Sequence, residues 1–356
     1  MKTTFKVVLA LCLAAAGVFD KGEVRALAGG RQAGVQAPAG RGQNVSPGER
    51  QGGRGREPRK PNVVSAPDLG YVHTLDALKW PAAEGEEEGT SGVAINSKGQ
   101  IVVFHRAPAG KAPVLVFDQS GTFVRAFGQD LGIARAHGLR IDANDNLWIT
   151  DVNVHQVFKL DPQGKVLLTL GTKGQAGKWD TGAGTQLLNQ PTDLGFDGAG
   201  NVYVANSHGG PDPRIDKFDR NGRFLTTWRV EPKEGDRANV HTIAVDPDGT
   251  VYASSREQKI IRVYNATGSL QRTLEMPALV CGLYVDPRGQ LWMTSGVDGQ
   301  IMTVDRKTGA PLGVTGGGPG RGADQYGEAH YMTMSREGAI YIADTVNRRV
   351  TKLAKP

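Results

Sequence analysis

The stretch HGLRIDANDNLWITDVNVHQVFKLD, residues 137–161, contains the pattern that decides the fold of this protein. Leu139 and Ile141 alternate with other residues, residues 143–146 interrupt the alternation, and an apolar run resumes at Leu147. Apolar alternation on both sides of a polar turn is typical of two β-strands. The stretch starts with His137, where the first strand is only beginning, and one copy of the pattern does not explain this position.

The same pattern recurs along the chain in six copies. They are separated by intervals of 46, 55, 49, 40 and 49 residues and begin at Ser91, His137, Thr192, His241, Cys281 and His330. Each copy continues into a third strand that ends in a polar turn, and most copies add a fourth strand. Four short strands in about 40–50 residues are typical of one blade of a β-propeller. The sequence therefore predicts an all-β fold, a six-bladed β-propeller that spans residues 61–356.

The last copy lacks a fourth strand, because the sequence stops at Pro356. The segment YVHTLDALKW, residues 71–80, lies ahead of the first full copy. We predict that this segment supplies the missing strand and closes the ring.

The blades resemble NHL repeats. The stretch YIADTVNRRVTKL, residues 341–353, has the D-x-x-N-x-R-[IV] pattern of that family at Asp344, Asn347, Arg348 or Arg349, and Val350. The second copy has DVNVHQVFKL in the same place. Because NHL propellers include scaffolds, RNA-binding proteins and enzymes, the fold by itself does not identify a function.

The first residues have the layout of a secretory signal. Lys2 and Lys6 precede an apolar run over residues 7–19, and residues 26–28 offer a cleavage site of small residues. The run is too short to span a bilayer, so we predict a signal peptide over residues 1–28 and no membrane span. The protein is then expected to be secreted or periplasmic. The alternative is that the segment is retained as an N-terminal anchor.

Residues 29–60 are rich in Gly, Arg, Gln, Ala and Pro, which predicts a disordered linker. Residues 1–70 hold 11 basic and 5 acidic side chains, and residues 71–356 hold 31 of each, so the net charge of +6 comes entirely from the N-terminal part. The neutral propeller lacks the basic face that a nucleic-acid partner requires. The basic linker could still touch acidic surfaces or RNA. Because Cys12 lies in the predicted signal peptide, only Cys281 remains in the processed chain, and no internal disulfide is expected. We expect the protein to be a monomer.

The repeat also explains the position of the histidine. His137, His241 and His330 share one register position in alternate copies, and the other copies have Ser, Thr or Cys there. The first strand of each blade runs beside the axis, so these side chains are related by about a third of a turn and face one another. Three neutral nitrogen ligands with an open fourth position are typical of catalytic zinc, although imidazole also suits other divalent metals. The alternative is that a polar channel mouth simply tolerates histidines.

The other histidines carry weaker predictions. His155 is expected to form a hydrogen bond between blades, and His105 at a strand end is expected to be structural. His73 lies on the closing strand, with no predicted role. His208, in the loop SHGGPDP, is expected at the channel mouth.

With these histidines in place, the chain resembles the peptidyl-α-hydroxyglycine α-amidating lyase family over residues 101–353. The resemblance is carried by HGLRID with LWITDVNVHQVFKLDPQGKVLLTLG, by NQPTDLGFDGAGNVYVANS, by VHTIAVDPDGTVYASSRE and by AHYMTMSREGAIYIAD. It implies a metal-dependent lyase that cleaves the N–C bond of a peptidyl- or N-acyl-α-hydroxyglycine to an amide and glyoxylate, without a redox cofactor. The substrate would be a small molecule or a peptide with a C-terminal α-hydroxyglycine.

Carried over by motif, the family's Zn²⁺ ligands fall on His137, His241 and His330. Its two arginines fall on Arg106 in IVVFHR and Arg256 in ASSRE. Their guanidinium groups would contact a carboxylate or a developing oxyanion. For either arginine the alternative is a surface or blade-linking role.

The chain also departs from the family. His208 lies closest to the place of the family's tyrosine base, so it would act as the base unless that function is lost. Tyr331 replaces the acidic residue after the third histidine, which puts the family's structural Ca²⁺ in doubt. Glu328 replaces a methionine and could bind the metal. Two other functions therefore stay open: another metal-dependent activity of hydrolase or lactonase type, and a non-catalytic NHL propeller that binds a ligand.

Overall fold

The computed structural model describes residues 59–84, 89–231 and 239–356. The predicted signal peptide, residues 1–28, and all but the last two residues of the predicted linker, residues 29–60, lie outside the described residues. Strands dominate the described part, which has only two short 3₁₀ helices, η1 (Ala82–Glu84) and η2 (Gln129–Leu131). No helix in this part has the length and hydrophobicity needed to cross a bilayer.

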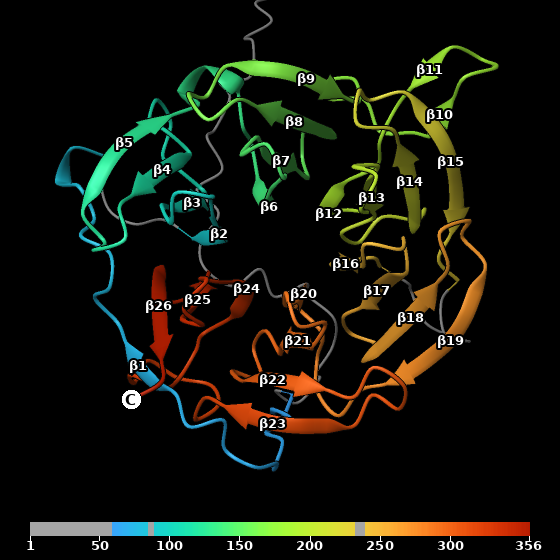
Figure 1. Ribbon diagram of the computed structural model, residues 1–356. Helices are drawn as coiled ribbons and strands as arrows, with labels where there is room; N and C mark the ends of the chain where they lie inside the picture. Colours follow the sequence, from blue (N-terminus) through green and yellow to red (C-terminus); the bar gives the residue numbers. More distant parts are fainter. Residues whose placement is uncertain (1–58, 85–88, 232–238) are drawn as a thin grey trace, which may run out of the picture. The chain divides into compact units, whose positions relative to one another are not determined.

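Six four-stranded antiparallel sheets surround a central axis, as Figure 1 shows, so the predicted six-bladed propeller is confirmed. Blade 1 consists of β2 (Thr90–Ile95), β3 (Ile101–His105), β4 (Val114–Phe117) and β5 (Phe123–Phe127). Blade 2 consists of β6 (Ala136–Ile141), β7 (Leu147–Asp151), β8 (Gln156–Leu160) and β9 (Val166–Leu170). Blade 3 consists of β12 (Pro191–Phe196), β13 (Val202–Asn206), β14 (Arg214–Phe218) and β15 (Phe224–Arg229).

The second half of the ring repeats this arrangement. Blade 4 consists of β16 (Ile243–Val245), β17 (Val251–Ser255), β18 (Ile260–Tyr264) and β19 (Leu270–Glu275). Blade 5 consists of β20 (Gly282–Val285), β21 (Leu291–Thr294), β22 (Ile301–Val304) and β23 (Pro311–Thr315). Blade 6 consists of β24 (Ala329–Met334), β25 (Ile340–Asp344), β26 (Arg349–Ala354) and β1 (Val72–Thr74). A peripheral hairpin, β10 (Trp179–Asp180) and β11 (Thr185–Gln186), joins blades 2 and 3.

The ring closes as the sequence predicted. β1, from the N-terminal side of blade 1, pairs antiparallel with β26, so that Val72 lies opposite Ala354 and Thr74 opposite Lys352. A blade composed of strands from both ends of the propeller ties those ends together, because neither end can leave without breaking the sheet.

The hydrophobic core lies between the faces of neighbouring blades. Phe104 of blade 1 and Leu139 and Ile149 of blade 2 belong to one buried cluster, and equivalent clusters recur around the ring. Inner strands are buried on both faces, whereas the outermost strand β15 alternates between half-buried and exposed residues. Close approach also demands a small residue at Gly92, where a Cβ atom would lie 2.8 Å from the Leu139 Cβ.

The segment ahead of β1 is fixed to blade 5. Asp298 accepts hydrogen bonds from the Arg59 guanidinium at 2.6 Å and from the Asn62 main-chain N–H at 2.8 Å. The Val64 N–H donates to Gln300 Oε1 at 2.7 Å. Arg59 falls within the range that the sequence predicted as linker, so contacts with the propeller already begin there.

Candidate functional site

The three register histidines meet on the axis of the propeller. His137 lies on β6, His330 lies on β24, and His241 lies two residues before β16. The imidazole centroid of His137 is 4.9 Å from that of His241 and 4.8 Å from that of His330, and the remaining pair is 5.1 Å apart. We call these three residues the axial triad. Its convergence follows from the repeat, since equal register positions in alternate blades face one another.

Each triad histidine is oriented by the next blade. His137 Nδ1 donates to the Thr192 carbonyl at 2.8 Å, His241 Nδ1 to the Cys281 carbonyl at 2.7 Å, and His330 Nδ1 to the Ser91 carbonyl at 2.6 Å. These acceptors are the residues that hold the same register position in the odd-numbered blades. Because a carbonyl oxygen only accepts, Nδ1 carries the proton in all three rings and Nε2 keeps its lone pair.

The Nε2 lone pairs suit a metal ion. His137 Nε2 is buried and has no hydrogen-bond partner among the described residues. A carbonyl that fixes the tautomer through the opposite ring nitrogen is the usual support of a metal-bound imidazole. The residues therefore fit the divalent metal that the sequence predicts.

Two further side chains, His208 and Cys281, each share a group of candidate ligand atoms with two of the triad histidines. The potential ligand atoms of His137, His208 and His241 all lie within 4.8 Å of one another, and so do those of His241, Cys281 and His330. The His208 ring centroid is 4.8 Å from that of His137. The sequence predicted His208 at the mouth, but it did not predict Cys281 as a ligand atom.

All four histidines at the mouth are held neutral. Burial, followed by the neighbouring histidines, holds the pKa of His137 well below its ordinary value. Burial and then Arg256 do the same for His241. Burial lowers the pKa of His330 to about 3, and burial and the cation of Arg135 lower the pKa of His208 to about 2. At neutral pH the four rings are therefore unprotonated, and each keeps a nitrogen lone pair that can bind a metal or accept a proton from an acidic group.

Guanidinium groups give the mouth its positive charge. Arg256 Nη1 donates to His241 Nε2 at 3.1 Å and pairs with Glu328 at 3.3 Å, while its Nε contacts Glu257 at 2.7 Å. Arg106 Nε is buried and has no partner among the described residues, and burial lowers the pKa of this group. Both arginines therefore lie in the environment of the axial triad.

Arg135 is a residue of the site that was not predicted from the sequence. Its cation lowers the pKa of His208, of His330 and of Arg106, and so it lies near all three. It stands two positions before His137, as Glu328 stands two positions before His330. This shared register position is the signal that could have identified it.

Two carboxylates fix the loops that carry these charges. Asp151 at the end of β7 accepts hydrogen bonds from the Ala134 N–H at 2.5 Å and the Arg135 N–H at 3.1 Å. Asp344 at the end of β25 accepts the Glu328 N–H at 2.9 Å. The NHL pattern residue Asp344 and its counterpart Asp151 thus position the side chains of the mouth.

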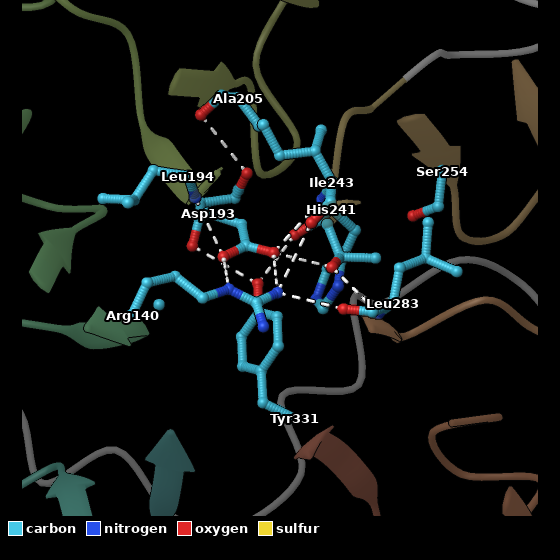
Figure 2. A network of polar contacts seen from close by, with 12 residues as sticks. Arg140, Asp193, Leu194, Ala205, His241, Ile243, Ser254, Leu283 and Tyr331 are labelled. Carbon is cyan, nitrogen blue, oxygen red and sulfur yellow. Dashed lines mark hydrogen bonds and ion pairs between the residues drawn. The ribbon is translucent and has the colours of Figure 1, made fainter. Parts of the chain in front are cut away.

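Next to the triad, the axis is filled by a polar network that Figure 2 shows. Tyr331 is fully buried and donates its hydroxyl to the His241 carbonyl at 2.9 Å. Arg140 lies over the Tyr331 ring at 5.3 Å, pairs with Asp193 at 2.7 Å and donates to the Leu283 carbonyl at 3.1 Å (Figure 2). The Arg140 guanidinium therefore binds the oxygen atoms of the axial network beside Tyr331, the residue that replaces the acidic residue expected from the resemblance.

The remaining histidines are structural, as predicted for two of them. His155 Nδ1 accepts the Gln190 N–H at 3.0 Å and so links blade 2 to the loop before blade 3. His105 Nε2 lies 3.0 Å from the Ala112 carbonyl within blade 1. His73, for which no role was predicted, joins the closing strand to Tyr326 and Thr315, each at 2.9 Å.

The sequence matches the NHL repeat model over residues 134–160. It is 32% identical over 212 residues to mouse (Mus musculus) peptidyl-glycine alpha-amidating monooxygenase, which covers 51% of this chain and 21% of that protein. It is 30% identical over 177 residues to peptidyl-alpha-hydroxyglycine alpha-amidating lyase 2 of Drosophila melanogaster, which covers 43% of this chain and 42% of that protein. The predicted similarity to the amidating lyases is confirmed, and the chain spans less than half the length of either relative.

Solved structures share the fold. A gluconolactonase from Xanthomonas campestris superposes with a TM-score of 0.54 at 20% identity, over 83% of this chain and 99% of the other. At this identity the likeness supports the propeller fold alone.

Proposed function

We propose that the chain is a metal-dependent lyase that cleaves the N–C bond of a peptidyl- or N-acyl-α-hydroxyglycine to an amide and glyoxylate. The observation that carries this proposal is the axial triad, in which every Nδ1 is tied to a carbonyl and every Nε2 keeps its lone pair. Similarity to proteins named amidating lyases supports the reaction class.

His137, His241 and His330 would hold the metal, with Zn²⁺ as our first choice. Such an ion, when bound, would act as a Lewis acid on the substrate hydroxyl and lower its pKa. The triad presents neutral nitrogen donors because burial keeps each imidazole unprotonated at neutral pH.

His208 would accept the hydroxyl proton and return it to the amide nitrogen as the N–C bond breaks. Its ring lies next to those of His137 and His241, at centroid distances of 4.8 and 5.5 Å. Its pKa, lowered to about 2, means that the ring is free to accept a proton but is a weak base. Proton transfer to His208 therefore requires a substrate hydroxyl that is already made acidic.

Arg106 and Arg256 would bind the carboxylate of the α-hydroxyglycine, which becomes the carboxylate of the glyoxylate product. A planar guanidinium can donate two parallel hydrogen bonds to a carboxylate, which fixes the substrate in one orientation. Arg106 Nε has no partner among the described residues, so this donor is available to a ligand. Arg256 remains anchored by Glu257 and Glu328 while it contacts the substrate.

The test is release of glyoxylate from α-hydroxyhippurate by the full chain, measured with and without a chelator. We expect activity that the chelator abolishes and that a divalent metal restores. His241→Ala should lower the rate by about a hundredfold or more, because it removes a metal ligand. His155→Ala is the matched control, since the His155 ring bonds the loop before blade 3 rather than the axial triad, and the change should leave the rate unchanged.

The proposal is wrong if the metal-loaded chain releases no glyoxylate, or if His241→Ala releases it at the parental rate. Hydrolysis of a lactone by the same preparation would then favour a hydrolase that uses the same residues. Absence of both activities and of bound metal would favour a non-catalytic binding propeller. We also propose export through residues 1–28 and a monomeric state, which N-terminal sequencing of the exported protein and light scattering would test.

A further inference from the structure

Cys281 is a buried thiol inside the candidate metal site. It is fully buried, directly precedes β20, and has the register position in blade 5 that the triad histidines have in blades 2, 4 and 6. Its Sγ and the ligand atoms of His241 and His330 all lie within 4.8 Å of one another. A thiol and two imidazoles at this spacing are a recurring donor set for zinc and related metals.

The equivalent side chains of the other odd-numbered blades are used differently. Ser91 Oγ donates to the Phe104 carbonyl at 3.1 Å. Thr192 Oγ1 lies 2.5 Å from the Val240 carbonyl and 3.3 Å from the Ala205 carbonyl. Both hydroxyl groups are therefore bonded to main-chain carbonyls. The Cys281 thiol instead lies beside the guanidinium of Arg256 and beside His241 and His330, where its sulfur can serve as a metal ligand.

A second observation points to a ligand at the adjoining group of donors, which shares His241 with the Cys281 group. His137 Nε2 is buried without a partner among the described residues, and its ring centroid is 4.9 Å from His241 and 4.8 Å from His330. Arg256 Nη1 lies 3.1 Å from His241 Nε2 and so supplies positive charge there. Because Arg256 is also held by Glu257 and Glu328, it can move off His241 Nε2 when a metal arrives and still keep a carboxylate partner.

We propose that Cys281 is a direct metal ligand, so that the axial site is a mixed site of imidazole nitrogen and thiolate sulfur. This inference rests on one part of the proposed function, namely that the axial histidines bind a metal. On binding, the Cys281 thiol loses its proton to solvent and the sulfur lone pair forms the bond to the metal. Soft thiolate then favours Zn²⁺, Co²⁺ or Cd²⁺ over hard cations that prefer oxygen.

Cobalt supplies a readout that is independent of activity. The metal-free full chain is titrated with Co²⁺, and the near-ultraviolet and visible spectra are recorded together with the bound cobalt. We expect about one cobalt per chain and a sulfur-to-cobalt charge-transfer band, because a coordinating thiol is deprotonated. Cys281→Ser should still bind cobalt through the histidines but lose this band. Serine should be accommodated, because Ser91 fills the same register position in blade 1.

Cys12→Ser, made in the unprocessed chain that retains residues 1–28, is the matched control, since Cys12 is the only other cysteine of the sequence. It should keep the charge-transfer band in full. Stoichiometric cobalt without the band in the parent, or a band that survives in Cys281→Ser, would overturn the ligand role of Cys281 and leave the proposed lyase untouched. No cobalt binding at all would overturn this inference and the metal site together, whereas glyoxylate release measured in the same preparation would report separately on the lyase reaction.

Discussion

His330 Nδ1 lies 2.6 Å from the main-chain oxygen of Ser91, a residue 239 positions away in the sequence. This bond joins the last blade to the first at the axis, while β1 joins the same blade at the rim. The candidate metal site and the closure of the ring therefore share a residue. Occupation of the site and stability of the fold should be linked.

We predict that metal removal lowers the melting temperature of the parent chain. A ligand that binds only the folded state stabilises it by about 3 kcal/mol when present at about a hundred times its dissociation constant. Differential scanning calorimetry with and without a chelator measures this effect. In His330→Ala the chelator should have almost no effect, and an equal effect in both proteins would contradict the link.

Tyr331→Phe should destabilise the propeller by about 1 kcal/mol, because it removes the hydroxyl that donates to the His241 carbonyl at 2.9 Å and retains the ring. Urea unfolding measures the difference. Tyr341→Phe is the control, since Tyr341 is a buried tyrosine on β25 that packs against Lys352 and lies outside the axial network. Equal effects of both changes would show that the axial hydroxyl contributes nothing specific.

Arg140→Met should have a larger effect, about 3–5 kcal/mol, because it leaves the Asp193 carboxylate buried without its cation. Urea unfolding again gives the value. The control is Arg223→Met, which removes an exposed pair with Asp219 at 3.1 Å and should change the free energy of unfolding far less. A small effect of Arg140→Met would mean that the hydrogen bonds from Thr242 and Ile243 suffice to stabilise Asp193.

The metal-free protein should lose stability as the pH falls below 6.5. The folded state keeps His330 neutral down to about pH 3 and His208 down to about pH 2, whereas the unfolded chain binds protons near the ordinary pKa of 6.5. The unfolded state then binds more protons, so each histidine removes on the order of 1.4 kcal/mol of stability per pH unit between its two pKa values. Urea midpoints at about pH 7 and about pH 5 should therefore lie closer together in His330→Asn than in the parent. Equal separations would refute this role for His330.

Arg135→Gln should raise KM about tenfold with a smaller change in kcat, if the Arg135 cation helps to attract and hold the substrate carboxylate in the ground state. Steady-state kinetics with α-hydroxyhippurate measures both constants. Arg223→Gln is the control, because the Arg223 side chain is 77% exposed and pairs only within its own turn. If Arg135→Gln behaves like this control, Arg135 contributes nothing to substrate binding.

The sequence determined the propeller, its six blades and the closure by β1, because a period-two alternation that repeats every 40–55 residues encodes strand order and register locally. It also determined that His137, His241 and His330 converge, since a shared register position becomes a shared distance from the axis. Both results need only the repeat itself.

Only the tertiary structure decided which other side chains join them. Arg135, Cys281 and Tyr331 come from three different blades, and their approach to the triad depends on side-chain directions and on the packing between blades. The same holds for the pairing of Arg140 with Asp193, 53 residues apart. The register positions of Arg135 and Cys281 place them near the axis, but their contacts arise only in the three-dimensional ring, where residues distant in sequence face one axis.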